Sequence, residues 1–188
     1  SSETRFTTLS DVDLSTLRVG YSEDFGGAPV DPAIRKTFRD RIEKIATHVQ
    51  NCRPVDLDLG NMDQCFDILR AESFLAAFGE VIRTEPTAFG FDIQTNVELG
   101  RSMSLADRAW AHVEQTRILR RFNALMQDFD VILLPTAPVS PFPWTQGHAA
   151  EIEGQSMDIY YRWLALTYRG SLAGGPSITL PCGRDPHG

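Results

Sequence analysis

The residues near the C-terminus have the composition of a nucleophilic active site. Residues 171–183 read SLAGGPSITLPCG, in which two serines and two glycines stand beside a short apolar run. A serine acts as a nucleophile only with a base within hydrogen-bond reach and with donors aimed at the developing oxyanion. Histidine or a neutral lysine is the base that such a site needs, so the positions of those residues decide what this stretch can do.

The four histidines form no recognisable catalytic motif. His48 and His112 fall within expected helices, His148 falls in a proline-rich loop, and His187 lies at the tail. The G-x-S-x-G turn that presents a nucleophilic serine in α/β-hydrolases is absent from the sequence. We expect surface or packing roles for these histidines.

Lysine is scarce in this sequence, which has sixteen arginines but only Lys36 and Lys44. A lysine that works as a base must be neutral near pH 7, which requires burial or crowding by positive charge. Both lysines flank the apolar stripe of one amphipathic segment and stand among other charged residues. A solvated helix face therefore explains them better than a serine–lysine site.

The sequence predicts neither a metal site nor an organic cofactor. The segment DLDLGNMDQ, residues 56–64, carries three aspartates but lacks the twelve-residue calcium loop with its terminal glutamate, so solvent-facing carboxylates are expected. The three cysteines are widely spaced and match neither a zinc pattern nor a disulfide framework. No glycine-rich phosphate-binding motif is present.

The composition is that of a globular protein and limits its partners. Of the 188 residues, 42% are hydrophobic and 23% charged, which fits a single domain over residues 1–188. The net charge of −7 argues against nucleic acid as a partner. No apolar run approaches the roughly 20 residues that span a bilayer, and the polar N-terminus resembles no signal peptide. We therefore expect no membrane partner and a cytoplasmic location.

The periodicity of apolar residues predicts an α/β fold. Strands are expected at 17–21, 53–59, 131–134 and 177–181, and helices at 32–49, 63–83, 91–100, 104–127 and 158–167, with a proline-rich loop at 137–154. This alternation predicts part of a mixed, largely parallel β-sheet flanked by helices. Four strands would leave long unpaired edges, so we expect a piece of a larger sheet that is truncated at both ends.

Local signals mark several of these boundaries. Asp31 is the expected N-cap of the first helix, with Pro32 at its first position. Ser104 and Asp107 resemble a capping box at the start of another helix. Residues 131–134 are continuously apolar, which is typical of a strand covered on both faces.

Three blocks of the sequence resemble successive parts of the amidase signature family. The blocks are LRVGYSEDFGGAPVDPAIRKTF at 17–38, DVILLPTAPVSPFPW at 130–144 and SLAGGPSITLPCGRDPHG at 171–188. Together they are similar to the C-terminal half of that family, in order and over nearly the whole chain.

The resemblance implies which chemistry the chain lacks. Family members hydrolyse amides or esters with a Ser–cis-Ser–Lys triad, whose lysine and Gly/Ser-rich tract lie in the N-terminal half. This sequence has neither. No catalytic residue is therefore carried over, and the stretch at 171–183 is not the nucleophile tract. The expected entity is a C-terminal fragment of an amidase, inactive alone, that contributes sheet structure and part of the substrate pocket.

The resemblance also implies a few binding residues. Thr136, Pro138 and Trp144 are candidates for lining the acyl side of the pocket, with plain loop packing as the alternative for each. Members that feed ammonia into aminoacyl-tRNA are expected to carry an acidic residue near Leu164, and its absence here argues against that subgroup.

The implied partners are the remainder of the parent polypeptide, a small-molecule amide substrate and, through the truncated sheet edges, a second copy of the chain. Two alternatives stay open at this point. The chain could be a naturally truncated, non-catalytic binding or scaffolding module of the same fold. The weaker alternative is a self-contained hydrolase that uses Ser140 or Ser177 with His148.

Overall fold

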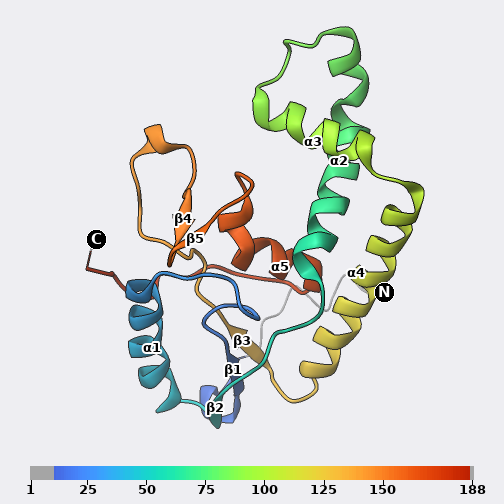
Figure 1. Cartoon of the computed structure of the whole chain (residues 1–188). Coiled ribbons are helices and arrows are strands. Elements are labelled where there is room, and N and C mark those ends of the chain that lie inside the picture. The colour runs from blue at the N-terminus through green and yellow to red at the C-terminus, as the bar shows by residue number, and fades with distance from the viewer. Residues whose placement is uncertain (1–10, 187–188) are drawn as a thin grey trace.

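A three-stranded parallel sheet is the centre of the fold (Figure 1). The computed structural model describes residues 11–186. Strand β1 (Arg18–Tyr21) lies in the middle, between β2 (Asn51–Pro54) and β3 (Val131–Leu133). Both neighbours run parallel to β1, so that Val19 stands opposite Cys52 on one side and Val131 on the other. Parallel strands need long crossover connections, and helices provide them here.

Helix α1 (Pro32–Ala46) connects β1 to β2 and confirms the predicted start signal. The Asp31 side chain accepts a hydrogen bond from the backbone N–H of Ala33, and proline occupies the first helical position. Phe38 and Ile42 are buried, and the Phe38 ring lies 6.4 Å from the ring of Tyr21 on β1. The apolar stripe of α1 thus faces the sheet.

Four further helices supply many of the buried apolar side chains. They are α2 (Met62–Thr84), α3 (Phe91–Ser102), α4 (Leu105–Leu125) and α5 (Ala165–Ala173). The predicted capping box of α4 is present, with Ser104 and Asp107 bonded reciprocally. Helix α3 lies against α2 so closely that a Cβ on Gly100 would come within 2.6 Å of the Ala71 carbonyl oxygen. Figure 1 shows α3 and the far end of α2 projecting away from the sheet.

The second expected strand is shorter than predicted. Pairing with β1 ends at Pro54, although the sequence predicts a strand through residue 59. The predicted alternation is real, because Leu57 and Leu59 are buried while Asp56 and Asp58 are exposed. A ladder needs a partner, however, and β1 itself ends at Tyr21, so the later residues continue as an irregular segment.

The prediction of a strand at 177–181 is wrong. These residues form no strand in the structure, and Ile178 and Leu180 are 82% and 68% exposed. The expected helix at 158–167 also lies later in the chain, as the short turn η4 (Arg162–Leu164) followed directly by α5. Helix α5 ends at Gly174, which has the left-handed φ of 73° typical of a helix C-cap.

The expected loop at 137–154 contains regular structure that the sequence analysis missed. A short turn, η3 (Trp144–Gln146), is followed by an antiparallel hairpin of β4 (Glu151–Ile152) and β5 (Gln155–Ser156). Glu153 and Gly154 connect the two strands, both with positive φ, as a tight hairpin turn requires. Strands of two residues are too short to produce a detectable alternation pattern.

Candidate functional site

The loops at the carboxyl ends of β1 and β3 lie side by side. In parallel α/β sheets ligands bind outside the carboxyl ends of the strands, which makes this edge the candidate site. The backbone N–H of Ser22, just after β1, donates to the Leu133 carbonyl at 3.1 Å. Farther along, the N–H of Asp31 donates to the Pro138 carbonyl at 2.8 Å. Loop 22–31 and loop 134–138 therefore form one continuous rim.

Loop 22–31 is held in a conformation that costs free energy. Phe25 is a buried non-glycine residue with φ of 48°, and Gly26 and Gly27 follow at 73° and 90°. A Cβ on Gly26 would approach the Leu57 carbonyl oxygen to 2.6 Å, so only glycine fits there. The Ser22 hydroxyl accepts a hydrogen bond from the Phe25 N–H at 3.2 Å. Such strain persists only where surrounding contacts enforce it.

Arg169 on α5 supplies much of that enforcement. Its guanidinium donates to the carbonyls of Phe25 and Gly26 at 2.8 and 3.1 Å. Two further bonds of 2.9 Å join it to both carboxylate oxygens of Asp63 on α2. The Arg169 residue is only 7% exposed. We call this arrangement of Arg169, Asp63 and the two carbonyls the Arg169 clamp.

The clamp perturbs the ionisation of Asp63. Partial burial raises the pKa of this carboxyl, but the hydrogen bonds and positive charge of Arg169 outweigh it, helped by the Tyr168 hydroxyl at 2.8 Å. The pKa of Asp63 therefore lies below its ordinary value. The group stays ionised at neutral pH and acts as a fixed acceptor, not as a general acid.

A second set of buried hydroxyls lies beside the clamp. Tyr161 donates to Asp67 at 2.9 Å, and Arg162 pairs with the other oxygen of Asp67 at 2.7 Å. Burial raises the pKa of Tyr161 and of Tyr168 above the ordinary tyrosine value. Both hydroxyls are therefore protonated at neutral pH and serve as hydrogen-bond donors rather than as bases.

The structure brings two of the three predicted pocket residues to the candidate edge. Thr136 is exposed on loop 134–138, while Pro138 is fully buried and bonds loop 22–31 through its carbonyl. Trp144 is 91% exposed on η3. Nothing in these positions tests a pocket role, so the role of all three stays a prediction.

The serines and histidines of the weaker alternative are not paired. The Ser140 hydroxyl donates to Asp185 at 2.5 Å, and Ser177 lies exposed in an irregular segment. Within residues 11–186, neither hydroxyl is hydrogen-bonded to His148. The ring of His112 contacts Glu72 at 3.1 Å, and His187 lies outside the described residues.

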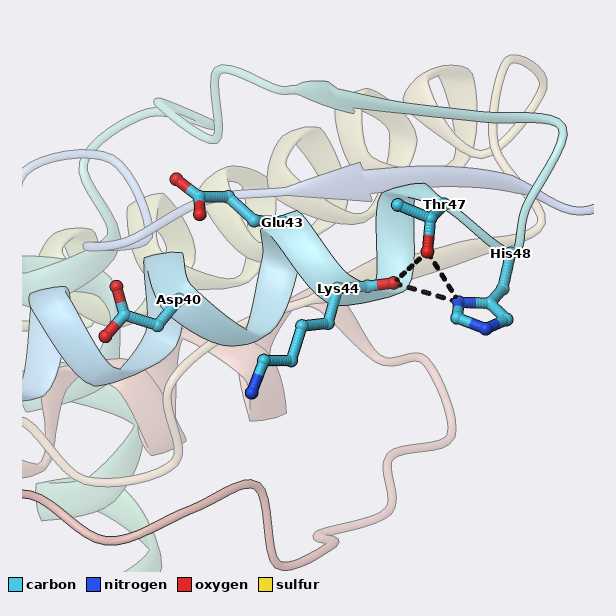
Figure 2. Close-up of a pocket in the computed structure, with 5 residues that line it drawn as sticks. All are labelled: Asp40, Glu43, Lys44, Thr47 and His48. Atoms are coloured by element: carbon cyan, nitrogen blue, oxygen red, sulfur yellow. Dashed lines mark hydrogen bonds between the residues drawn. The ribbon is translucent and has the colours of Figure 1, made fainter.

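A surface hollow at the end of α1 also contains a hydroxyl beside an imidazole, as Figure 2 shows. It measures about 580 Å³ and includes Thr47 and His48. The Thr47 hydroxyl donates to the Lys44 carbonyl at 2.8 Å, and the same carbonyl lies 3.0 Å from Nδ1 of His48. The Thr47 hydroxyl also lies 2.8 Å from Nδ1 of His48, but both residues are exposed just after α1. These contacts fit a helix C-terminus whose last carbonyl is satisfied by nearby side chains better than they fit an activated nucleophile.

Both lysines are exposed, as the sequence predicts. Lys36 is 73% exposed and pairs with Asp40 on the same helix, and Lys44 is exposed near the end of α1. Neither has the buried or crowded environment that a neutral lysine base requires.

A second hollow, of about 350 Å³, lies between the segment after β2 and the end of α4. Asp56 and Asp58 line it, but each accepts a backbone N–H nearby and so caps a local turn. Over residues 11–186, no three potential metal-ligating side chains are grouped to hold an ion. In the same range no helix has the length and hydropathy to cross a membrane.

The clamp residues are those that sequence reasoning missed. Asp63 was expected to be a solvent-facing carboxylate, yet it accepts both bonds of a buried arginine. The available signal was Arg169 itself, the charged residue of an otherwise uncharged helix. A buried arginine in this helix must have partners inside the fold, although the sequence of the helix does not identify those partners.

Comparisons with known proteins agree with this architecture. The fold defines a class of α/β proteins with a parallel sheet whose faces are covered by helices. The family model described as Amidase matches residues 1–188, so the chain belongs to the amidase signature family.

Among curated proteins the chain is similar to glutamyl-tRNA(Gln) amidotransferase subunits. One such subunit from Clostridium acetobutylicum is 24% identical over 191 residues, which covers 88% of this chain and 39% of that protein. Another, from Prochlorococcus marinus strain MIT 9313, is 34% identical over 124 residues, covering 63% of this chain and 24% of that protein. The chain thus spans well under half the length of these relatives.

Solved structures give the same picture of the fold. A bacterial aryl acylamidase of the amidase signature family superposes with a TM-score of 0.79 at 18% identity, covering 93% of this chain and 38% of that one. A second structure, described as an amidase, gives a TM-score of 0.77 at 20% identity, with 89% and 38% covered. At these identities the likeness establishes the fold alone.

Proposed function

We propose that this chain is the C-terminal portion of an amide hydrolase that acts by serine acyl transfer. The parent enzyme would attack a small amide with a serine, release the amine, and hydrolyse the acyl-enzyme with water. The observation that carries the proposal is the family match over residues 1–188 together with the absence, among residues 11–186, of a serine hydroxyl hydrogen-bonded to a histidine or lysine side chain. The nucleophile and base would then lie on polypeptide outside these 188 residues.

The part played by this chain is structural and substrate-facing. Loops 22–31 and 134–138 would form one wall of the site, and the Arg169 clamp would keep the first of them in place. Thr136 and Pro138 lie on that wall, and Trp144 is positioned on η3 with its side chain accessible. No metal or organic cofactor is required for this chemistry.

The principal partner would be the remainder of the parent polypeptide, acting in the cytoplasm. The support is exposed apolar surface on two parts of the chain. Val131 on the outer strand of the sheet is 38% exposed, and Ile178 and Leu180, in the irregular segment after α5, are largely uncovered. Such surface is costly in water and is suited to burial against further chain.

The test compares two purified polypeptides, the 188-residue chain and the protein encoded by the complete gene. An anilide such as 4-nitroacetanilide is a suitable first substrate, because one structural neighbour is an aryl acylamidase. We expect turnover by the complete gene product and none by the 188-residue chain. Turnover by the chain alone that disappears when Ser140 or Ser177 becomes alanine would contradict the proposal. A folded but inactive gene product, tested over alkyl and aryl amides and esters, would favour the scaffolding alternative.

A further inference from the structure

The segment from Val139 to Met157 is built as a small unit of its own. Ala149, Ile152 and Met157 are buried together in a cluster that is separate from the main core. In Figure 1 this segment is the orange loop on the left, with β4 and β5 at its base. Most of its other residues are exposed. A unit with a separate small core can open without unfolding the rest of the chain.

One end of this segment is fastened by aromatic packing to the turn before α5, whose Trp163 packs against the small cluster and not against the main core. Phe142 stacks edge-to-face on Trp163 with ring centroids 5.4 Å apart, and Trp163 belongs to η4, directly before α5. Apolar contact of this kind does not depend on the charges at the other end of the segment.

The other end is fastened by a single charged residue. Glu153, at the tip of the β4–β5 hairpin, accepts the backbone N–H of Val30 at 3.3 Å and lies 3.5 Å from the Arg35 guanidinium. Arg35 in turn donates to the Val30 carbonyl at 3.0 Å. Both groups of Val30 are thus engaged, and Val30 lies in loop 22–31 at the candidate site.

The charges around this contact are not balanced. Arg35 also lies 3.6 Å from Glu23 and 3.4 Å from Asp24, so one cation serves three carboxylates, and Arg39 neutralises only Glu23. Removing Glu153 from the group leaves Arg35 with two carboxylates nearby. Release of the hairpin therefore does not leave Arg35 without a carboxylate partner.

The tip of the β4–β5 hairpin also carries backbone strain. Glu153 has φ of 52°, a conformation that non-glycine residues adopt at a cost, and Gly154 follows at 77°. A glycine at position 153 would remove this cost.

We propose that residues 139–157 form a flap over the carboxyl edge of the sheet and that Glu153 is its clasp. With Glu153 on Val30 and Arg35, the flap lies against loop 22–31. With the clasp released, the flap swings on the Phe142–Trp163 contact and uncovers the rim formed by loops 22–31 and 134–138. That this motion admits substrate rests on the proposed function, whereas the motion itself does not.

Amide hydrogen exchange on the full chain, resolved to single residues, tests the clasp. Glu153→Gly removes the side chain and the strain together, and Glu153→Gln keeps an acceptor for Val30 but loses the charge. Glu151→Gln is the matched control, since Glu151 is an exposed carboxylate on the same hairpin without an ion pair in the described part of the chain.

We expect the Val30 amide and the hairpin amide of Met157, which bonds the Ala150 carbonyl at 2.8 Å, to exchange about tenfold faster in Glu153→Gly. In Glu153→Gln the increase should be about threefold, because a neutral acceptor is weaker. Amides of β1 should be unchanged in both, and Glu151→Gln should match the unsubstituted chain.

Two results would overturn the proposal. Exchange of the Val30 and Met157 amides that is unchanged or slower in both Glu153→Gly and Glu153→Gln would mean that the clasp holds nothing. Equal acceleration of the β1 amides would mean that the segment opens only when the whole domain unfolds. Neither result depends on turnover, so a failed clasp is distinguishable from a failed hydrolase assignment.

Discussion

Replacement of Asp63 by asparagine tests the Arg169 clamp at its most sensitive point. Asparagine preserves the shape of the side chain and one acceptor oxygen, but it turns an amide N–H₂ toward the second guanidinium nitrogen. One of the two 2.9 Å bonds to Arg169 is then lost, together with the negative charge. Arg169, whose side chain is 9% exposed, keeps only the two loop carbonyls and the remaining amide oxygen.

The expected cost follows from these exposures. Removing one partner of a fully buried ion pair costs about 3–5 kcal/mol. The Asp63 side chain is 37% exposed, so water compensates part of that loss, and we expect about 2 kcal/mol in the free energy of unfolding. For a chain of this size the melting temperature should fall by about 4–8 °C.

The pH dependence gives the same prediction a second readout. Because the pKa of Asp63 is lowered in the folded state, its stabilisation is present above the unfolded carboxyl pKa of about 4 and is lost as the pH falls through the folded value. The stability difference between the unsubstituted chain and Asp63→Asn should therefore be full at pH 7 and shrink below about pH 4.

Urea denaturation, followed by far-ultraviolet circular dichroism, measures this difference. Asp158→Asn is the control, since Asp158 pairs with Arg162 at 3.1 Å but is 73% exposed, and we expect it to cost less than about 0.5 kcal/mol. A loss below that same value for Asp63→Asn at pH 7, or a difference that does not shrink in acid, would refute the reasoning.

Three further predictions concern single positions. Gly60→Ala should lower the free energy of unfolding in urea by about 2–3 kcal/mol, because φ is 123° and the new Cβ would lie 2.5 Å from a carboxylate oxygen of Glu114. Gly90→Ala is the control: its φ is ordinary and the space around it is open, so it should cost about 0.5 kcal/mol or less. Exposed Cys182 should react with iodoacetamide well before Cys65, whose thiol pKa burial raises to about 11; mass spectrometry of timed samples checks the order. Hydrogen bonds from an arginine side chain and backbone N–H lower the pKa of Asp130 to about 2, so its carboxyl carbon should titrate near that pH by NMR, and a midpoint near 4 would contradict this.

Local features of the fold could be predicted from the sequence because their partners are close in the chain. The Asp31 cap bonds the N–H two residues later, and the Ser104 box closes over three residues. The order of strands and helices is local in the same sense, since each element carries its own apolar period. The parallel α/β class follows from that order.

Features with distant partners could not be predicted in this way. Residues 177–181 have the apolar character of a strand, but a strand also needs a neighbour, and in this structure the segment has none. The partners of Arg169 lie as far as 144 residues away, so the charged residue could be noticed but its role could not. Among the candidate site residues, Thr136 and Pro138 were suggested by a block that resembles the family, and their pocket role stays a prediction. The strained turn at Phe25 left no signal in residue type.

The central claim is that the acylated serine of the enzyme lies on polypeptide outside these 188 residues. Labelling the complete gene product with a serine-directed fluorophosphonate, followed by peptide mapping, locates that serine directly. We expect one adduct, on a peptide outside residues 1–188, and no adduct on the isolated chain. An adduct within the chain, above all on Ser140 or Ser177, would contradict the account.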